Sequence, residues 1–326
     1  MNERIAAVLA THGAHLEQVT PLHGGACQEN FRISATVEGK ATQWALRSDS
    51  DTSLPGSLRR RDEFAVIEAA VAAGVQTPRA QWLSPGLLRP GRDAYFLDWV
   101  PGEAIGRRVV RNPELAGARE KLPGALAGSL AALHGVVPAQ VTLPLAPVAS
   151  TPARAALTQL RGMIDGLPSA LPAVELALVW AEKHLPTSSE VVLVHGDFRT
   201  GNFLVTPDGL AGILDWEFAH WGSRYEDLSW ISVRDWRFNR LELPVGGFAA
   251  RRPFYDAYAA ASGHTVDVDQ VLWWEVIGNL RWAVGSVYQG ERYLSGQATD
   301  LELIAIARRC VEMEHEALRL IHRGAL

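Results

Sequence analysis

Residues 191–216 read VVLVHGDFRTGNFLVTPDGLAGILDW and contain the most informative pattern in this chain of 326 residues. An apolar run at 191–194 is typical of a short buried strand, and it leads directly into the motif His-Gly-Asp at 195–197. Asn202 then follows the aspartate at the spacing D-x-x-x-x-N. Because a short loop joins the two residues, we expect both side chains to point into one cleft.

A hairpin is predicted immediately after this loop. The sequence Thr-Pro-Asp-Gly at 206–209 has the residue types that form tight turns. The apolar residues 211–214 that follow predict a returning strand. This strand ends at Asp215, so the hairpin brings a second carboxylate back beside Asn202.

These three side chains match the needs of phosphoryl transfer. That reaction requires a base for the proton of an acceptor hydroxyl and cations that neutralise phosphate oxygens. Mg²⁺ prefers oxygen ligands and keeps several waters, so one or two protein groups are sufficient to hold it. We therefore predict that Asp197 is the catalytic base and that Asn202 and Asp215 bind Mg²⁺.

The same pattern admits two other interpretations. Asp and Asn are common turn formers, so the segment could be a surface loop without chemistry. A metallohydrolase centre could instead use His195, Asp197 and Asp215, although the chain has no further His or Cys at ligand spacing.

The motif H-G-D-x-x-x-x-N at 195–202, followed by Ile-Leu-Asp-Trp at 213–216, resembles the aminoglycoside phosphotransferase and choline kinase family. The Glu-Asp-Leu sequence at 226–228 resembles the acidic pair that this family carries shortly afterwards. The chain is most similar to uncharacterised bacterial phosphotransferases and to kinase domains fused to acyl-CoA dehydrogenases, from about residue 20 to the end. The resemblance implies an α+β, bilobal, protein-kinase-like fold. It also implies that His195 and Asp227 support the catalytic loop.

Composition is compatible with this interpretation. The chain is 48% hydrophobic and carries a net charge of −5, which argues against a nucleic-acid-binding or polybasic membrane protein. Cys27 and Cys310 are its only cysteines, so no disulfide framework is predicted. Met1 is not followed by a basic-then-apolar leader, and no long uncharged apolar run occurs. We expect a cytoplasmic protein with no nucleic-acid, membrane or obligate protein partner.

Periodicity predicts two unequal lobes. Residues 1–100 should form an N-lobe with a small antiparallel, nucleotide-binding sheet and one long helix. Residues 101–326 should form a larger, mainly helical C-lobe with the catalytic loop, the metal site and the acceptor pocket. In the N-lobe we expect helices over 2–16 and 60–73, and strands over 18–22, 30–37, 42–48, 79–83 and 94–100. In the C-lobe we expect helices over 115–134, 153–164, 173–184, 251–262, 268–289 and 300–322.

The N-lobe should hold the nucleotide, ATP or GTP. Gly24 and Gly25 resemble a glycine-rich loop whose backbone N–H groups approach phosphate oxygens. A cation is expected on the strand over 42–48, and Arg47 occupies the place where kinases use Lys. Glu63 on the following helix is its predicted partner, with Asp62 as the competing one.

The resemblance also predicts where the nucleotide base binds. The sequence at 96–102 resembles the hinge of the family, with the backbone C=O of Asp98 and the backbone N–H of Val100 facing the base. Leu204 and Leu214 would form an apolar floor beneath it.

The acceptor is a small hydroxylated molecule of unpredicted identity. Candidate pocket residues come from the Trp-rich region and are Glu217, Trp221, Arg281 and Trp282. Acidic residues in this region alternate with arginines, a mixture that does not favour a strongly cationic acceptor.

The predicted function is therefore Mg²⁺-dependent transfer of the γ-phosphate of ATP or GTP to a hydroxyl group. The alternatives are a nucleotide-binding pseudokinase, which the arginine in place of lysine supports, and the metallohydrolase described above.

Overall fold

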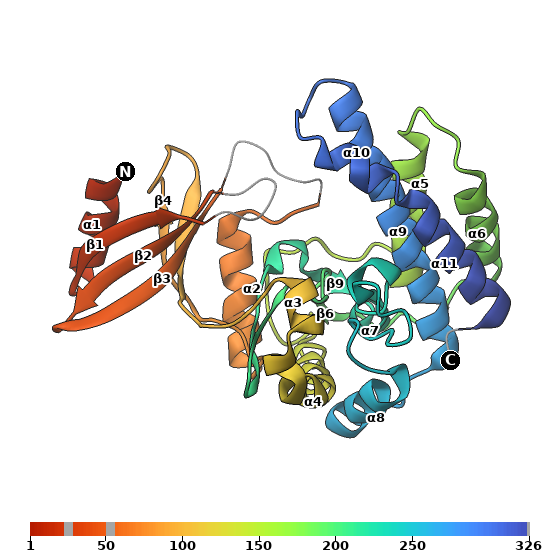
Figure 1. The fold of residues 1–326 in the computed structure, drawn as a ribbon, viewed down its shortest axis with the longest axis horizontal. Coiled ribbons are helices and arrows are strands. Elements are labelled where there is room, and N and C mark those ends of the chain that lie inside the picture. The colour runs from red at the N-terminus through yellow and green to blue at the C-terminus, as the bar shows by residue number, and fades with distance from the viewer. Residues whose placement is uncertain (23–28, 50–55, 325–326) are drawn as a thin grey trace.

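The computed structural model describes residues 1–22, 29–49 and 56–324. An antiparallel sheet formed by the first hundred residues is followed by a mainly helical part, and the two lie side by side (Figure 1). The predicted α+β class is thus confirmed. Gly24 and Gly25, predicted to contact phosphate, lie outside the described residues.

Within the described residues, five strands form the N-terminal sheet in the order β1-β2-β3-β5-β4, and all neighbours are antiparallel. The predicted tight hairpin between β2 and β3 is present, because Glu38 and Gly39 both have positive φ angles, of 48° and 78°. The strands are β1 (Ala14–Pro21), β2 (Glu29–Val37), β3 (Lys40–Ser48), β4 (Ala80–Pro85) and β5 (Asp93–Asp98).

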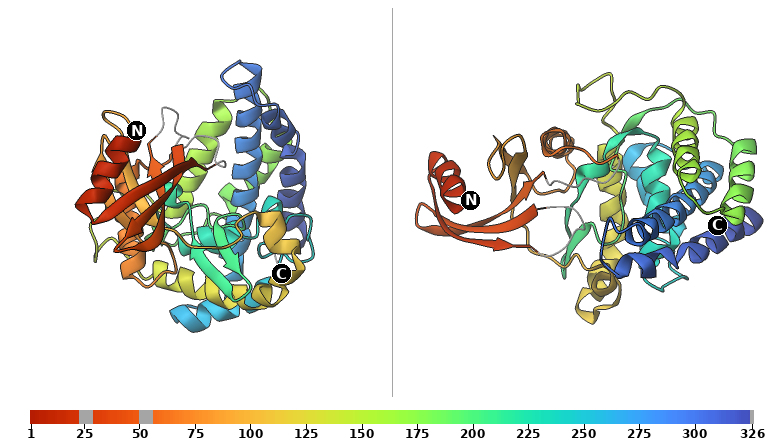
Figure 2. Two further views of the ribbon diagram at one scale, coloured as in Figure 1. Left: turned by 60° about the vertical axis from the view of Figure 1, so that its left-hand side comes forward. Right: turned by 90° about the horizontal axis from the view of Figure 1, so that it is seen from above.

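Two helices flank this sheet, and each packs into a different hydrophobic core. Helix α1 (Asn2–Thr11) packs Ile5 and Leu9 against the sheet in a small separate core that includes Trp44 and Phe96. Helix α2 (Arg60–Ala72) lies between the sheet and the helical part (Figures 1 and 2). Its apolar face belongs to the large core of the helical part, so α2 ties the sheet to the catalytic half.

The helical part surrounds two small two-stranded sheets that carry the central motif. One pairs β6 (Val192–Val194) with β9 (His220–Gly222), and the other pairs β7 (Phe203–Thr206) with β8 (Gly209–Ile213). The helices are α3 (Gly106–Arg111), α4 (Ala116–Leu133), α5 (Pro152–Asp165), α6 (Pro172–Lys183), α7 (Arg224–Trp230), α8 (Arg251–Ser262), α9 (Val268–Leu294), α10 (Glu302–Ala307) and α11 (Cys310–Arg323).

Three predicted helices are wrong in extent, and one of them, predicted over 268–289, continues to Leu294 as α9. The helix predicted over 2–16 ends at Thr11, because Gly13 has a φ angle of 72° and the chain continues as β1. The helix predicted over 300–322 is divided into α10 and α11. At the division, the N–H of Arg309 bonds to the C=O of Ile306, a tighter i→i−3 pattern that interrupts the α-helical ladder.

Helix α7 and strand β9 were not predicted. Ser223 and Glu226 form a capping box at the start of α7, and the sequence S-x-x-E at 223–226 is the signal that would have indicated this helix. Both elements line the site described below.

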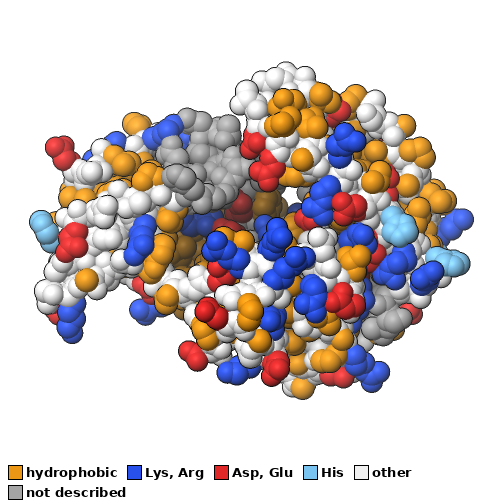
Figure 3. Space-filling model, in the orientation of Figure 1, with side chains coloured by type: hydrophobic (Ala, Val, Ile, Leu, Met, Phe, Trp, Pro, Cys, Tyr) orange, Lys and Arg blue, Asp and Glu red, His pale blue; other side chains and the backbone are white. Residues whose placement is uncertain are grey.

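The two parts of the chain also share backbone contacts. The N–H of Ile213 bonds to the C=O of Gln76 at 2.8 Å, and the Thr77 hydroxyl donates to the C=O of Ile213 at the same distance. Figure 3 shows Lys and Arg side chains gathered on the helical part, next to the hollow where it meets the sheet. None of the helices in the described portion has the length and apolar character needed to cross a lipid bilayer.

Candidate active site

Asp197 lies at the centre of a group of hydrogen-bond donors. Its carboxylate accepts hydrogen bonds from the Asn202 side-chain amide at 2.7 Å and from the Trp230 indole N–H at 2.8 Å. The Nε of Arg199 lies 3.1 Å from each carboxylate oxygen. The Arg199 guanidinium stacks on Trp236, with its carbon 4.4 Å from the ring centroid. Asp197 is therefore held in one orientation, with only 15% of its side chain exposed.

Asn202 and Asp215 are brought together by the β7–β8 hairpin, as predicted. Phe203 pairs with Ile213, and the N–H of Leu214 bonds to the C=O of Asn202 at 2.8 Å. The Asn202 side-chain N–H₂ donates to both the C=O and the carboxylate of Asp197, which leaves its Oδ1 as the oxygen able to meet a cation. Asp215 has φ and ψ angles of 63° and 62°, a left-handed conformation that is unusual outside glycine and common at functional sites.

The backbone of the catalytic loop is anchored to Asp227. Its fully buried carboxylate accepts hydrogen bonds from the N–H groups of His195 and Gly196, at 2.8 and 3.0 Å, and contacts Nε2 of His134 at 3.2 Å. Burial alone would raise the pKa of Asp227, but these donors outweigh it and lower the pKa below its usual value. Gly196 has a φ angle of 77°, and a side chain there would collide with the C=O of Phe218, so the motif requires glycine.

His195 connects the catalytic loop to the strand that precedes Asp215. Its Nδ1 accepts from the N–H of Asp197 at 3.2 Å, so its Nε2 carries the proton and donates to the C=O of Leu214 at 2.9 Å. Both ring nitrogens are occupied. Within the described residues, no three His, Cys, Asp or Glu side chains converge as a metal cluster, which gives no support to the metallohydrolase interpretation.

Arg47 reaches from β3 into the same site. Its guanidinium pairs with Glu63 at 3.2 Å and with Asp215 at 2.6 Å. The partner on α2 is therefore Glu63 and not Asp62. Burial alone would lower the pKa of Arg47, but the two carboxylates raise it well above its usual value, so the guanidinium stays charged. Desolvation alone would raise the pKa of Asp215, but Arg47 lowers it below its usual value.

Glu217 belongs to this charged network. Arg60 of α2 is buried between Glu63 and Glu217, and its contact with Glu217 is 3.2 Å. Sequence reasoning missed Arg60 because nothing in the local pattern distinguishes it from the neighbouring arginines. Glu217 is accordingly an ion-pair partner of α2 and does not line the cavity described next.

The predicted base-binding residues lie where the two parts of the chain meet. Asp98 ends β5, and Val100 begins the connection to the helical part. Leu204 and Leu214 are half-buried on and beside the β7–β8 hairpin. Leu204 approaches Gly102 so closely that an added Cβ there would lie 3.0 Å from the leucine Cβ.

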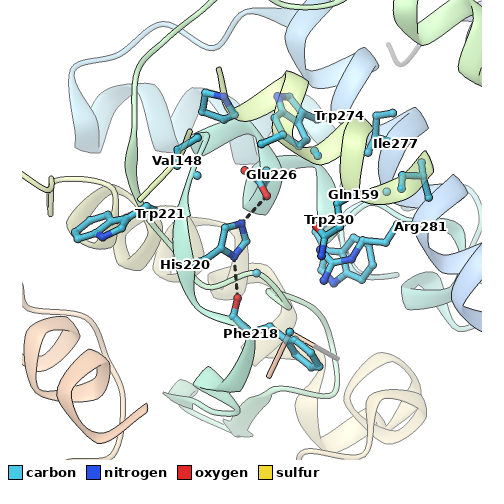
Figure 4. Close-up of a pocket in the computed structure, with 18 of the residues that line it drawn as sticks. Val148, Gln159, Phe218, His220, Trp221, Glu226, Trp230, Trp274, Ile277 and Arg281 are labelled. Carbon is cyan, nitrogen blue, oxygen red and sulfur yellow. Dashed lines mark hydrogen bonds and ion pairs between the residues drawn. The ribbon is translucent and has the colours of Figure 1, made fainter. Parts of the chain in front are cut away.

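A cavity of about 440 Å³ lies between β9 and helices α5, α7 and α9, with Trp230 in its wall (Figure 4). Of the predicted pocket residues, Trp221 and Arg281 line it. Trp282 does not, because it packs in a separate cluster with Met313 and carries Arg309 over its ring. His220, Glu226 and Trp230 line the cavity and were not predicted.

The fold and the site together define a kinase-like α+β protein. The model of the phosphotransferase enzyme family (APH) matches residues 18–264. The chain therefore belongs to the phosphotransferase enzyme family, as its motifs predicted.

Individual relatives agree with this assignment. The chain is 27% identical over 238 residues to the mouse (Mus musculus) acyl-CoA dehydrogenase family member 10, a match that covers 71% of this chain and 21% of the relative. The chain thus spans about one fifth of the length of that curated relative.

Two solved structures show the same fold. A candidate aminoglycoside phosphotransferase from Ralstonia eutropha JMP134 matches with a TM-score of 0.78 and 17% identity, over 100% of this chain and 99% of the other. The spectinomycin phosphotransferase APH(9)-Ia, in complex with ADP and spectinomycin, matches with a TM-score of 0.63 and 15% identity over 98% of each chain.

Proposed function

We propose that this protein is a Mg²⁺-dependent O-phosphotransferase that moves the γ-phosphate of ATP or GTP to the hydroxyl group of a small molecule. The observation that carries the proposal is the 2.7 Å hydrogen bond between the Asn202 amide and the Asp197 carboxylate. This contact supports the proposal because it joins the carboxylate proposed as the base to the amide proposed as a metal ligand. The backbone hydrogen bond from Leu214 to Asn202 brings the neighbouring residue Asp215 close to Asn202.

Asp197 acts as the base in this proposal. The acceptor hydroxyl gives its proton to the carboxylate while its oxygen attacks the γ-phosphorus. The bond between that phosphorus and the β–γ bridging oxygen breaks, so the products are a phosphate monoester and a nucleoside diphosphate. Trp230 and Asn202 orient the carboxylate by hydrogen bonds, and Arg199 adds a positive charge beside it.

The donor set fits magnesium. Asn202 offers an amide oxygen and Asp215 a carboxylate whose lowered pKa keeps it ionised, and hard oxygen ligands of this kind suit Mg²⁺. When bound, the ion would neutralise charge on the phosphate groups. The β7–β8 pairing supports this choice because it brings together the two ends of the hairpin, which carry Asn202 and Asp215.

The nucleotide contacts are proposed from the chemistry of the side chains and from the similarity to known phosphotransferases. Arg47 supplies a fixed, charged fork for phosphate oxygens and is braced by buried Glu63. The basic side chains around the hollow in Figure 3 favour an anionic ligand there. The relative APH(9)-Ia holds ADP, which supports a nucleotide site in this fold. By the same likeness, Gly24, Gly25, Asp98, Val100, Leu204 and Leu214 remain proposed nucleotide contacts.

The test is a transfer assay with radiolabelled ATP and GTP over hydroxylated acceptors, including aminoglycosides, amino alcohols, sugars and hydroxy acids. Asp197→Asn should keep Mg²⁺-nucleotide affinity and lower turnover by about 10²- to 10⁴-fold, the usual contribution of a general base. Asp208→Asn, in the exposed turn of the same hairpin, is the matched control and should be unchanged. Full activity of Asp197→Asn would refute the assigned base, and nucleotide binding without transfer to any acceptor would favour the pseudokinase.

A further inference from the structure

The cavity beside Trp230 has the dimensions and lining of a small-molecule site. Its volume of about 440 Å³ lies within the range usual for such sites. Most of its wall is apolar and comes from the proline-containing segment at 146–152, from helix α5 and from helix α9, including Val148, Leu160, Met163, Trp274 and Ile277. Such a wall favours a ligand with a substantial apolar body.

The carboxylates in the wall are already occupied by donors. Glu226 accepts from the N–H of Ser223 at 2.8 Å and contacts Nε2 of His220 at 3.0 Å. Asp227 is fully buried and accepts from two backbone N–H groups and His134. A cationic ligand would therefore have to compete with these donors for either carboxylate.

Arg281 differs from these groups. It projects from α9 into the cavity, and its guanidinium carbon lies 5.0 Å from the centroid of the Trp230 ring (Figure 4). Among the described residues, Arg281 forms no ion pair within 4.0 Å. Arg281 is therefore a half-buried cation in a largely apolar wall, without a carboxylate within ion-pair distance in the described part of the chain.

The position of this cation relates directly to Asp197. Trp230 contacts both groups, because its ring faces the Arg281 guanidinium and its N–H bonds to the Asp197 carboxylate at 2.8 Å. A single indole ring thus separates the cation from the proposed base.

We infer that this cavity takes a hydroxylated molecule with an apolar body and one anionic group, the anion held by Arg281 and the hydroxyl directed toward Asp197. Phosphorylation of the ligand's hydroxyl rests on the proposed phosphotransferase function. Binding of the ligand in the cavity does not depend on that function. A polycationic amino sugar is the opposite kind of ligand, since it would meet the Arg281 guanidinium, and the carboxylates in the described lining already accept hydrogen bonds from other groups.

The first experiment measures binding with three probes of one shape. These are 3-hydroxyoctanoate, its methyl ester and 1-aminooctan-3-ol, which are anionic, neutral and cationic. Calorimetry on the wild-type protein should give tightest binding for the anion. Equal or tighter binding of the ammonium compound, or no binding of the anion, would overturn the inference.

Variants of Arg281 then assign the contact. Arg281→Ala should weaken binding of 3-hydroxyoctanoate by about 10- to 100-fold, the range for a lost charge-assisted hydrogen bond, and leave the ester unaffected. Arg281→Lys should recover part of the affinity. Arg292→Ala, on the same helix but outside the cavity lining, is the control and should bind like wild type. If Arg281→Ala weakened binding of the acid and of the ester equally, the loss of affinity would come from packing. That result would refute the role of the charge.

Transfer assays separate this inference from the proposed function. Phosphorylation of 3-hydroxyoctanoate that depends on Asp197 and Arg281 supports both. Arg281-dependent binding with no phosphoryl transfer to any acceptor supports the cavity's preference and refutes the phosphotransferase. Asp197-dependent transfer to a cationic acceptor, unaffected by Arg281→Ala, supports the phosphotransferase and refutes the anionic acceptor.

Discussion

The charged centre around Asp215 and the cavity around Arg281 differ in the partners that they give to an arginine side chain. At the charged centre, Arg47 and Arg60 share Glu63 and make further ion pairs with Asp215 and Glu217. In the cavity wall, Arg281 faces an indole ring and has no carboxylate partner in the described residues. Trp230 connects the cavity wall to the catalytic loop, because it contacts both Arg281 and Asp197.

This difference follows from the ligands that each region would meet. Phosphate groups and a divalent ion have the same charges in every phosphotransferase, so a network that fixes geometry in advance is useful there. An acceptor varies between relatives, so a cavity that selects by shape and by one charge can change without disturbing the chemistry. The following changes test whether the two regions are as separate as this comparison implies.

The largest effect is expected from Glu63→Ala. Because Glu63 is completely buried and pairs with both Arg47 and Arg60, its loss leaves two buried guanidinium groups short of a partner. We expect the free energy of unfolding to fall by about 3–5 kcal/mol, measured by urea denaturation. Glu68→Ala, exposed on the same helix, should change it by less than about 0.5 kcal/mol. Similar values for both variants would show that the network contributes little.

A smaller loss of stability is expected for Asp227→Asn. An amide cannot accept all the hydrogen bonds that this carboxylate receives. The free energy of unfolding should therefore fall by about 1–3 kcal/mol at neutral pH. The pKa of Asp227 is lowered in the folded protein. Its contribution is therefore fully present above the unfolded pKa of about 3.9 and is lost as pH falls through the lower folded value.

The measurement is the difference in unfolding free energy between wild type and Asp227→Asn from pH 7 to pH 2. The difference should be constant above about pH 5 and should shrink toward acid. Asp256→Asn, exposed on α8, provides the control. A difference that grows on acidification would contradict the lowered pKa.

Trp230→Phe tests the junction between the two regions. Phenylalanine keeps an aromatic face for Arg281 but loses the N–H that holds Asp197 at 2.8 Å. Turnover should fall by about tenfold, equivalent to one hydrogen bond of about 1.4 kcal/mol, while nucleotide affinity is unchanged. Trp236→Phe is the control, because the Trp236 N–H has no hydrogen-bond partner in the described residues. If both variants kept full turnover, orientation of Asp197 by Trp230 would be excluded.

The smallest effect is expected from His220→Asn. Burial alone would lower the pKa of His220, but Glu226 at 3.0 Å raises it overall. With 40% of its side chain exposed, the pair should contribute at most about 1 kcal/mol. That contribution is present below the unfolded pKa of about 6.5 and is lost as pH rises through the higher folded value. Unfolding of both proteins from pH 5 to pH 9 measures it, and a difference that increases toward alkaline pH would disprove the pairing.

The parts of the site that sequence reasoning identified lie close together along the chain. Asp197, Asn202 and Asp215 fall within one loop and one hairpin, so spacing and turn chemistry were enough to bring them together. The hairpin between β2 and β3 and the extent of α8 were predicted for the same local reason.

The parts that it missed depend on contacts between distant segments. His134, which directly follows α4, contacts Asp227 93 residues further along the chain, and Arg60 contacts Glu217 across 157 residues. Trp230 was not among the predicted pocket residues, and its hydrogen bond to Asp197 depends on α7, which was not predicted. Glu217 and Trp282 were proposed for the acceptor pocket on local composition alone, and they lie outside the cavity lining.

The sequence by itself determined the family, the α+β class and the residues available for phosphoryl transfer, because these depend on short motifs and on the periodicity of apolar residues. Only the tertiary structure decided which arginine enters the cavity without a carboxylate partner among the described residues, and which tryptophan connects that arginine to Asp197. Charge pairing and cavity shape arise where helices and strands from distant parts of the chain pack together. No local pattern of residues specifies that packing.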